Sequence, residues 1–441
     1  MNVVVIGCGV VGAAIAYELS QVKGISVTVL DKHQPATAST GAALGVLMGI
    51  ISHKIKGNAW RMRLHSIQRY ETWIPELEAL TGRSIPYNRQ GILMLLSEVE
   101  EMSKWEKLVD TRRSQGFPLE IWNAEQIKNI CPQIDTEKNH TAIYSPSDRQ
   151  VNPTALTLAL VEAAQHRGVT FKFGVDVLGA EPQNSAEYRV LSPENEERKD
   201  FLLTQQRQSP QRGEPNVVRP EGNPPYDFSP HGAGSSGLSN ASRLNGGNPP
   251  KFVRRETLLT TSLRTGLALQ DCFGGTISAD WFVIASGLGS SLLTAQLKQM
   301  VDIRPVLGQA LHMRLEGSLG NLNFQPVITG DDVHIVPTSN GDYWVGATVE
   351  FPSNENDIPP NQELLESVRK RALAFCPDLA KATIIRTWSG LRPRPEGRPA
   401  PIIGKLPGFS NILLATGHYR NGVLLAPATA DTIREMIISN I

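Results

Sequence analysis

Three glycines near the N-terminus have the spacing of a turn that holds the phosphates of a dinucleotide. Gly7, Gly9 and Gly12 form a G-x-G-x-x-G pattern, and Asp31 follows 19 residues after the last glycine. The first glycine permits a tight turn, the second lets the backbone approach a pyrophosphate, and the third allows close packing of helix on strand. Asp31 is then suited to accept hydrogen bonds from ribose hydroxyls. A glycine-rich turn without a ligand is the alternative interpretation.

A second glycine-flanked turn lies near the C-terminus, in residues 417–428 (GHYRNGVLLAPA), and precedes a helical pattern. The N-terminus of a helix suits a flavin carbonyl or a substrate anion. Residues 36–47 (ATASTGAALGVL) are small and glycine-rich, which suits close approach to an extended cofactor. The first motif alone does not distinguish NAD from FAD. Two such turns at opposite ends of the chain favour one long cofactor in a discontinuous domain.

The composition argues against several classes of protein. Lys and Arg number 43 and so do Asp and Glu, so the net charge is zero and gives no support to nucleic acid as the main partner. The four cysteines, Cys8, Cys131, Cys272 and Cys376, form no C-x-x-C pair, and the nine histidines form no H-x-x-x-H pair. We therefore expect no disulfide framework, no metal site and a reducing, cytoplasmic setting.

The apolar segments are too short or too interrupted to cross a membrane. The apolar N-terminus lacks a basic leader and contains the three glycines, which argues against a signal peptide. The longest other apolar run, residues 42–51, is about half the length that a membrane-spanning helix needs. No membrane span is predicted.

Alternating strand and helix patterns position these motifs. Apolar runs predict strands at residues 2–6, 26–30, 91–96, 169–173 and 281–286, and helical spacing predicts helices at 10–20, 60–80 and 152–167. Several of these strands end at a glycine. The pattern predicts an α/β fold with a Rossmann-type sheet.

Residues 204–250 differ from the rest of the chain. Pro, Gly, Ser and Asn occupy 26 of these 47 positions, and apolar residues are few. Such a segment cannot bury enough apolar surface to offset its ordering entropy. We expect a disordered surface insertion that the fold tolerates as a long loop, and a docking role is the alternative.

The chain resembles the D-amino acid oxidase superfamily of FAD enzymes, and within it most closely the glycine oxidase branch associated with thiamine biosynthesis. The resemblance rests on GCGVVG with Asp31, ASTGAALG, VNPTAL, WFVIASGLGS, RPVLGQ, HIVP with VGATVE, WSGLRP and GHYRNGVLLAPAT. It covers nearly the whole chain except residues 184–255, and the last two motifs are the most diagnostic.

This resemblance implies a cofactor and a reaction. FAD is expected to be non-covalent, because the region PEGRPAPIIG has no cysteine where related sarcosine oxidases tether the flavin. Hydride transfer from the substrate to the flavin would oxidise a glycine or small D-amino acid to its imine, which hydrolyses to an oxoacid and ammonia. Dioxygen or another acceptor would then reoxidise the flavin. The expected cofactor-binding residues are Gly7, Gly9, Val10, Val11, Gly12, Asp31, Lys32, Ser39, Gly45, Val46, Val177, His418, Arg420, Asn421, Gly422, Val423 and Leu424.

Three residues are candidates for substrate binding, and no acid or base is assigned as catalytic. Arg392 in WSGLRP matches the arginine that holds the substrate carboxylate, a role that suits the planar, always charged guanidinium. Arg420 lies in the turn that borders flavin and substrate. His334 stands where close relatives carry a tyrosine that touches the substrate, so glycine is less secure as substrate than the reaction class. A structural role is the alternative for all three residues.

Other functions stay open at this point. The altered HIVP region also permits oxidation of larger D-amino acids or N-methyl amines, and a flavin-binding subunit without turnover or a nicotinamide dehydrogenase are further hypotheses. The FAD-binding domain is expected to comprise residues 1–90, 145–303 and 386–441. An α+β substrate domain with an antiparallel sheet would comprise residues 91–144 and 304–385. The sequence does not predict an oligomeric state.

Overall fold

The computed structural model describes residues 1–96, 102–177, 179–180, 267–270, 276–317, 319–338, 341–352 and 358–439. The predicted insertion at residues 204–250 and Cys272 lie outside the described residues. Within them, the chain forms two large sheets and two small ones.

A six-stranded sheet contains the N-terminus of the chain. Its order is β19-β20-β13-β1-β2-β9, and all neighbours are parallel except β19 and β20. The central strands are short apolar runs such as NVVVI and WFVI, as expected for strands covered on both faces. The strands are β1 (Asn2–Ile6), β2 (Ser26–Asp31), β9 (Thr170–Phe173), β13 (Trp281–Ile284), β19 (Ile402–Lys405) and β20 (Ile412–Thr416).

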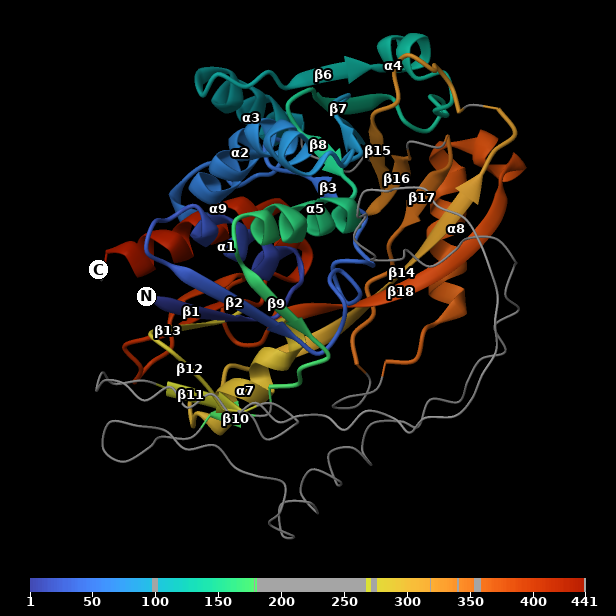
Figure 1. Ribbon diagram of the computed structural model, residues 1–441. Coiled ribbons are helices and arrows are strands. Elements are labelled where there is room, and N and C mark those ends of the chain that lie inside the picture. The colour runs from blue at the N-terminus through green and yellow to red at the C-terminus, as the bar shows by residue number, and fades with distance from the viewer. Residues whose placement is uncertain are drawn as a thin grey trace, which may run out of the picture. The chain divides into compact units, whose positions relative to one another are not determined.

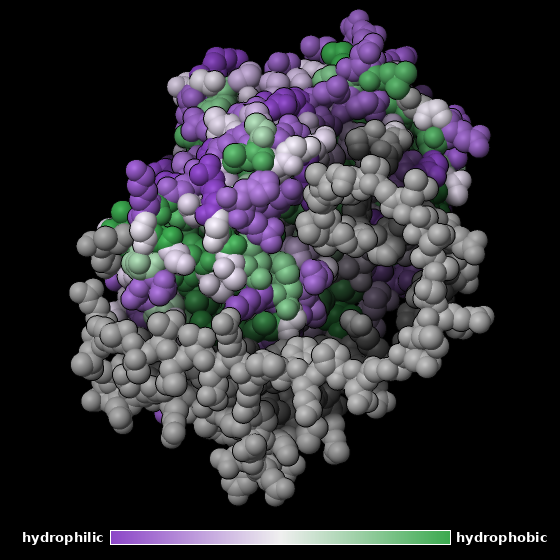
Figure 2. Space-filling model, viewed as in Figure 1, coloured by the Kyte–Doolittle hydropathy of each residue, from purple (hydrophilic) through white to green (hydrophobic). Residues whose placement is uncertain are grey.

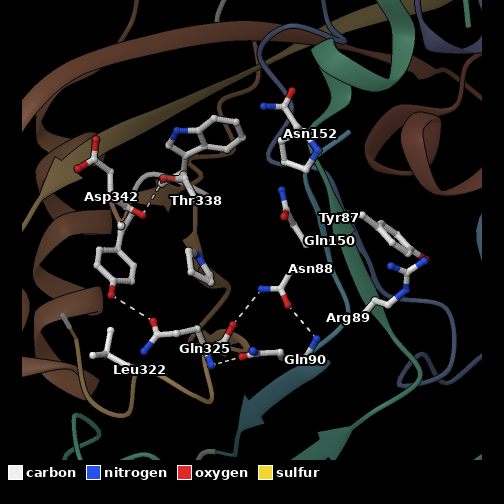
Figure 3. A pocket seen from close by; sticks show the side chains of 15 residues that line it. Tyr87, Asn88, Arg89, Gln90, Gln150, Asn152, Leu322, Gln325, Thr338 and Asp342 are labelled. Carbon is white, nitrogen blue, oxygen red and sulfur yellow. Dashed lines mark hydrogen bonds between the residues drawn. The ribbon is translucent and has the colours of Figure 1, made fainter. Parts of the chain in front are cut away.

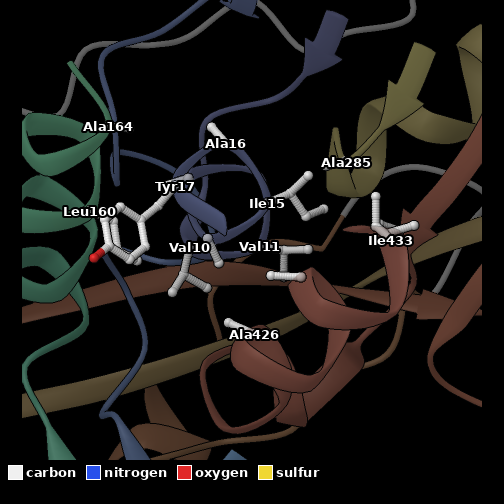
Figure 4. Packing of buried hydrophobic residues seen from close by; sticks show 14 of the residues in the cluster. Val10, Val11, Ile15, Ala16, Tyr17, Leu160, Ala164, Ala285, Ala426 and Ile433 are labelled. Atoms are coloured by element: carbon white, nitrogen blue, oxygen red, sulfur yellow. The ribbon is translucent and has the colours of Figure 1, made fainter. Parts of the chain in front are cut away.

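Helices cover both faces of this sheet (Figure 1). One face packs against α1 (Val10–Ser20), α2 (Gly57–Thr81), α5 (Pro153–His166) and α9 (Gly422–Ile438) in the largest apolar cluster. Figure 4 shows Val11 and Ile15 of α1 near Ile433 of α9, with Tyr17 beside Leu160 of α5. The other face packs against Leu293 of α7 (Ser290–Gln296) and against Leu297, which follows that helix. The helix α1 is therefore buried almost all round, which explains its alanines and glycine.

The second large sheet has eight strands, in the order β18-β14-β17-β16-β15-β5-β7-β6. Its pairs are antiparallel except β5 with β15. One face packs against α8 (Gln362–Phe375), and the other carries a small apolar cluster that includes Leu44. The strands are β5 (Ile92–Leu95), β6 (Glu120–Asn123), β7 (Thr141–Ser145), β14 (Ile303–Arg314), β15 (Val327–Gly330), β16 (Val333–Pro337), β17 (Tyr343–Gly346) and β18 (Thr383–Pro395).

The remaining elements connect or flank these sheets. They are β3 (Val46–Leu47), β4 (Tyr87–Asn88) and β8 (Arg149–Val151), which form one small sheet; β10 (Gly179–Ala180), β11 (Leu267–Gln270) and β12 (Thr276–Ala279), which form another; and α3 (Met102–Ser114), α4 (Ala124–Ile130), η2 (Gly287–Gly289), η3 (Pro377–Lys381) and η4 (Tyr419–Asn421).

The predicted α/β fold class is confirmed, and the predicted strands and helices occur within a few residues of their expected bounds. The expected antiparallel sheet contains one parallel pair. The predicted domain boundary near residue 386 falls within β18. No helix of the described part is long and apolar enough to cross a bilayer. On the face shown in Figure 2, hydrophilic side chains cover the region of α2 and α3, and the hydrophobic patches there are small.

Candidate functional site

The N-terminal glycine turn joins β1 to α1, and close contacts with the surrounding backbone require two of its glycines. Gly7 has a φ of 105°, and a Cβ there would lie 2.6 Å from the carbonyl oxygen of Ala285. A Cβ at Gly12 would lie 1.9 Å from the carbonyl oxygen of Gly7. The turn therefore cannot close with side chains at these positions.

Gly9 differs, because only one side-chain atom among the described residues beyond its chain neighbours lies within 4 Å of the position that a Cβ would occupy. The nearest atom to a Cβ there would be Thr40 Oγ1, at 3.2 Å. Gly9 is the N-cap of α1, it supplies no capping side chain, and the first turn contains no acidic residue. The Val10 N–H donates to Thr40 Oγ1 at 3.0 Å. The N-terminus of α1 therefore has the open approach and the N–H groups that a diphosphate needs.

Asp31, at the end of β2, has a role in the turn that the sequence motif does not reveal. The Cys8 N–H donates to its Oδ2 at 2.6 Å, and the His33 N–H donates to its Oδ1 at 2.8 Å. The carboxylate thus braces the glycine turn from the neighbouring strand and remains partly exposed, whereas Lys32 is exposed. Its remaining lone pairs suit the ribose hydroxyls, so the residues of this turn fit the adenosine diphosphate part of FAD.

The segment 39–48 crosses from β18 to β8 and is fastened at both ends. Ser39 Oγ donates to the Leu391 carbonyl at 2.6 Å, and Trp388 Nε1 donates to the Ala42 carbonyl at 3.1 Å. At the other end β3 pairs with β8, and Gly45 has a φ of 75°. A Cβ at Gly45 would lie 1.8 Å from the Val151 carbonyl, so this glycine is required by packing.

Two buried charges, which sequence reasoning missed, hold the loop that follows. Asp148 accepts the N–H groups of Gly49, Ile50 and Ile51 at 2.7 to 2.8 Å. The fully buried Arg112 donates to the carbonyls of Ile50, Ser52 and Lys54. Burial raises the pKa of Asp148, and the backbone N–H groups oppose this rise. Neither residue stands in a recognisable motif, so only the structure reveals their part in positioning the segment.

The C-terminal turn connects β20 to α9 through two residues with left-handed backbone. Gly417 has a φ of 66° and Tyr419 a φ of 52°. Between them, His418 is buried and hydrogen-bonds Thr429 Oγ1 of α9 at 2.9 Å through Nε2. Burial lowers the pKa of His418 to about 4, so the ring is neutral and acts as a brace between turn and helix.

The other expected cofactor residues of this part differ in exposure. Asn421 and Gly422 are partly exposed, so their backbone groups can contact a ligand, whereas Val423 and Leu424 are buried in the core around α9. Val177 is buried on the opposite face of the six-stranded sheet, in the cluster that contains Leu30.

Arg392 lies on β18 with its guanidinium against β14. A Cβ at Gly308 would lie 2.2 to 2.4 Å from the guanidinium atoms, and Nη1 donates to the Leu307 carbonyl at 3.0 Å. Burial lowers the pKa of Arg392 and the nearby charge of Arg420 lowers it further, while Tyr419 and Glu350 act in the opposite direction. Among the described residues, no carboxylate oxygen lies within 4.0 Å of Arg392 or Arg420. An internal ion pair therefore does not explain Arg392.

His334, on β16, lies within electrostatic range of both arginines. Its Nδ1 hydrogen-bonds Thr329 Oγ1 at 2.9 Å. Burial lowers the pKa of His334 to about 4, Arg420 and Arg392 also lower it, and Asp332 opposes them. The structure therefore brings the three predicted substrate residues together as two guanidinium groups beside a neutral imidazole. This arrangement can bind an anion such as a carboxylate.

A separate cavity of about 540 Å³ lies near the turn between β16 and β17 (Figure 3). Carboxamides surround it, and its two charged residues have partners elsewhere: Arg89 pairs with Glu71, and Asp342 with Arg314 and His312. None of the predicted site residues lines it, so we do not assign the substrate carboxylate to this cavity. Its lining includes Asn88, Arg89, Gln90, Gln150, Asn152, Gln325, Thr338, Asp342 and Trp344.

The described part contains no cluster of three His, Cys, Asp or Glu residues that could hold a metal ion. Cys8, Cys131 and Cys376 are free and buried, and burial raises the pKa of each thiol. These cysteines are therefore poor nucleophiles.

Comparisons with known proteins identify the family of this chain. The family model described as "FAD dependent oxidoreductase" (DAO) matches residues 2–204 and 253–436. The chain is 26% identical to a glycine oxidase of Bacillus licheniformis over 439 residues, which is 100% of this chain and 93% of the relative. It is 28% identical to the bifunctional protein ThiO/ThiG of Trichormus variabilis over 442 residues, and it spans about half the length of that relative (52%).

Among solved structures, the fold is similar to that of a glycine oxidase from Geobacillus kaustophilus, with a TM-score of 0.74. That structure is 22% identical, and the match covers 99% of this chain and 94% of the other. An iminodiacetate oxidase from Chelativorans sp. BNC1 matches with a TM-score of 0.71 and 18% identity, over 99% of this chain and 95% of the other. At these identities the likeness establishes the fold.

Proposed function

Because this chain belongs to the DAO family of FAD-dependent oxidoreductases, we propose that it oxidises a small amino acid, glycine or a D-amino acid, to its imine. The imine then hydrolyses to an oxoacid and ammonia, and dioxygen or another acceptor takes the electrons. The observation that carries this proposal is the pair of arginines, Arg392 and Arg420, without a carboxylate partner among the described residues.

The residues that would hold FAD come from three segments. The glycine turn with Gly9, the carboxylate of Asp31 and the N-terminus of α1 suit the adenosine diphosphate part, and the segment with Gly45 and Val46 and the turn at Arg420 suit the flavin part. When bound, FAD supplies the acceptor for the hydride that leaves the α-carbon. We propose that the six-stranded sheet and its helices form the FAD-binding domain and the eight-stranded sheet the substrate domain.

The protein's own part in the reaction is positioning. The partly buried guanidinium of Arg392 would hold the carboxylate by two charge-assisted hydrogen bonds, and this fixes the α-carbon. Because Thr329 can donate to Nδ1 of the neutral His334, Nε2 would carry the proton and serve as a second donor. Arg420 would add positive charge near the turn that precedes α9 and favour negative charge that develops there.

Anaerobic bleaching of the flavin absorbance tests this function. The purified protein is mixed with glycine, D-alanine, a longer D-amino acid and sarcosine, and with decarboxylated amines such as methylamine. Rapid bleaching by an amino acid supports the proposal, and the preferred member of the panel decides between small amino acids, longer D-amino acids and N-methyl amines. A yellow protein that none of these compounds bleaches would indicate a flavin-binding subunit without turnover.

The Arg392→Leu variant tests the role of the guanidinium. A carboxylate left without its partner costs about 3 to 5 kcal/mol, which predicts a fall in kcat/KM of roughly 10² to 10⁴ for an amino acid. A decarboxylated amine should lose much less. Arg394→Leu is the matched control, because Arg394 already pairs with Glu396 at 3.1 Å. Equal losses for the acid and the amine would remove Arg392 from the substrate site.

A further inference from the structure

Tyr419 occupies a backbone conformation that a tyrosine rarely adopts. Its φ is 52°, in the left-handed region, and it follows Gly417, which already has a φ of 66°. A glycine at residue 419 would adopt the same φ without steric strain, whereas the strain of a bulky residue must be offset by other interactions in the protein. The side chain of Tyr419 therefore has a role beyond that of closing the turn.

The phenol of Tyr419 lies near the arginines of the candidate site. The turn η4 packs against β18, which carries Arg392, and Arg420 Cζ lies 5.6 Å from the centre of the Tyr419 ring. Tyr419 is only partly buried, and its hydroxyl makes no hydrogen bond to another residue of the described part. The interaction of Tyr419 with Arg392 raises the pKa of that guanidinium, as expected for a phenol oxygen close to it.

The guanidinium groups of Arg392 and Arg420 and the hydroxyl of Tyr419 could all be satisfied by one kind of ligand, a carboxylate. Among the described residues, no carboxylate oxygen lies within 4.0 Å of the Arg392 or Arg420 guanidinium, and none accepts a hydrogen bond from the Tyr419 hydroxyl. A single carboxylate between them would accept from all three, because a carboxylate has about four lone-pair sites. His334, which lies within electrostatic range of both arginines, is neutral and adds no charge that would repel or neutralise the carboxylate.

We propose that Tyr419 is a substrate-binding residue whose hydroxyl donates a hydrogen bond to the carboxylate held by Arg392. This proposal rests on the proposed function and makes it more specific: the site selects α-amino carboxylates by three donors from β18 and from the turn before α9. The strained backbone positions the phenol beside Arg392, where its hydroxyl can donate to the bound carboxylate.

Two variants and a control test this role. Tyr419→Phe removes only the hydroxyl, and Tyr419→Gly also removes the strain. Tyr144→Phe is the control, because its hydroxyl donates to the Gln90 carbonyl at 3.2 Å, away from the arginines. The probe is acetate, a carboxylate without an amine, titrated into each FAD-containing protein and followed by calorimetry and by the change in flavin absorbance.

We expect Tyr419→Phe to raise the Kd of acetate roughly tenfold or more, because a hydrogen bond to a charged group is lost. Bleaching by methylamine, which has no carboxylate, should be affected much less than bleaching by an amino acid. Tyr419→Gly should weaken acetate binding at least as much while its melting temperature stays equal to or above that of the parent. A structural tyrosine would give the opposite pattern, with a lower melting temperature and unchanged acetate affinity.

Failure of this proposal is distinguishable from failure of the proposed function. If the parent is bleached by amino acids but Tyr419→Phe binds acetate as tightly as the parent, Tyr419 is not a substrate-binding residue and the function stands. If no amine bleaches the parent, the proposed function fails, and the acetate titrations still report whether the Tyr419 hydroxyl contributes to the binding of a carboxylate.

Discussion

Adding one methyl group at Gly308 should displace the guanidinium of Arg392, the proposed substrate-binding group, without disturbing the fold. In Gly308→Ala the new Cβ would lie 2.2 to 2.4 Å from three atoms of the Arg392 guanidinium, whereas ordinary contacts begin at 3.4 Å. The guanidinium must therefore move by about 1.2 Å. Gly308 does not have a left-handed φ, so alanine is compatible with its backbone. The flexible end of Arg392 gives way at little cost in stability.

A displacement of this size predicts a loss of about 10²-fold in kcat/KM for an amino acid, because 1 Å of misplacement has that effect on a well-positioned substrate. Flavin content and melting temperature should match the parent. Gly390→Ala is the matched variant: Gly390 faces Gly308 across the strands, but its Cβ would meet Ala42 Cβ at 2.2 Å. It should lower flavin content. If Gly308→Ala keeps the parent's kcat/KM, Arg392 does not hold the carboxylate as inferred.

Three further predictions concern the cofactor site and stability. Asp31→Ala and Gly9→Val should each purify with less than half of the parent's flavin per chain. The first variant loses the acceptor for the Cys8 N–H, and the second places a side chain in the approach to the N-terminus of α1. A flavin absorbance at 450 nm equal to that of the parent would contradict the cofactor site. Asp148→Asn should lower the free energy of unfolding by about 2 to 4 kcal/mol and speed proteolysis within residues 49–54. The reason is that an amide cannot accept from three backbone N–H groups as the carboxylate does. Asp110→Asn, at an exposed residue, is the control, and urea unfolding measures the stability of both variants. His65 pairs with Asp431, which raises the pKa of His65, so the stability from this pair should be present below pH 6.5 and be lost as pH rises through the raised pKa. Because His65 is half exposed, His65→Gln should cost less than about 1 kcal/mol at pH 6 and nothing at pH 9, and a cost that grows with pH would refute the assignment.

Local patterns predicted the glycine turn and its strand and helix well, because their physical causes lie within a few residues. Gly7 and Gly12 are explained by contacts inside the turn or just across β13, so the spacing alone identifies them. The brace from Asp31 to Cys8 and the acceptor Thr40 depend on strand pairing and on a loop 30 residues away. Sequence periodicity does not contain such information.

The buried charges were unpredictable for a different reason. Asp148 and Arg112 satisfy backbone groups of an irregular loop, and such a loop has no periodic signal. A charged residue in a polar stretch is normally a solvated one. The strain at Tyr419 is likewise a property of backbone geometry, and the sequence GHYRNG does not reveal which of its residues adopts a left-handed φ.

The register of β18 determines how the proposed substrate and cofactor sites are aligned. One face of β18 carries every second residue, among them Trp388, Gly390 and Arg392. On that face, Trp388 donates to the Ala42 carbonyl and Gly390 allows Ala42 to approach closely. The guanidinium of Arg392 covers Gly308. A slip of one residue would turn all three to the opposite face and remove the contacts of Trp388 and Gly390 with Ala42. Pairing with β14 fixes this register from Ile303 to His312, and the register shift occurs only beyond His312. The distance between Arg392 and the segment 39–48 is therefore set within a single strand, so the proposed substrate and cofactor sites keep their alignment without relying on the packing of one large sheet against the other.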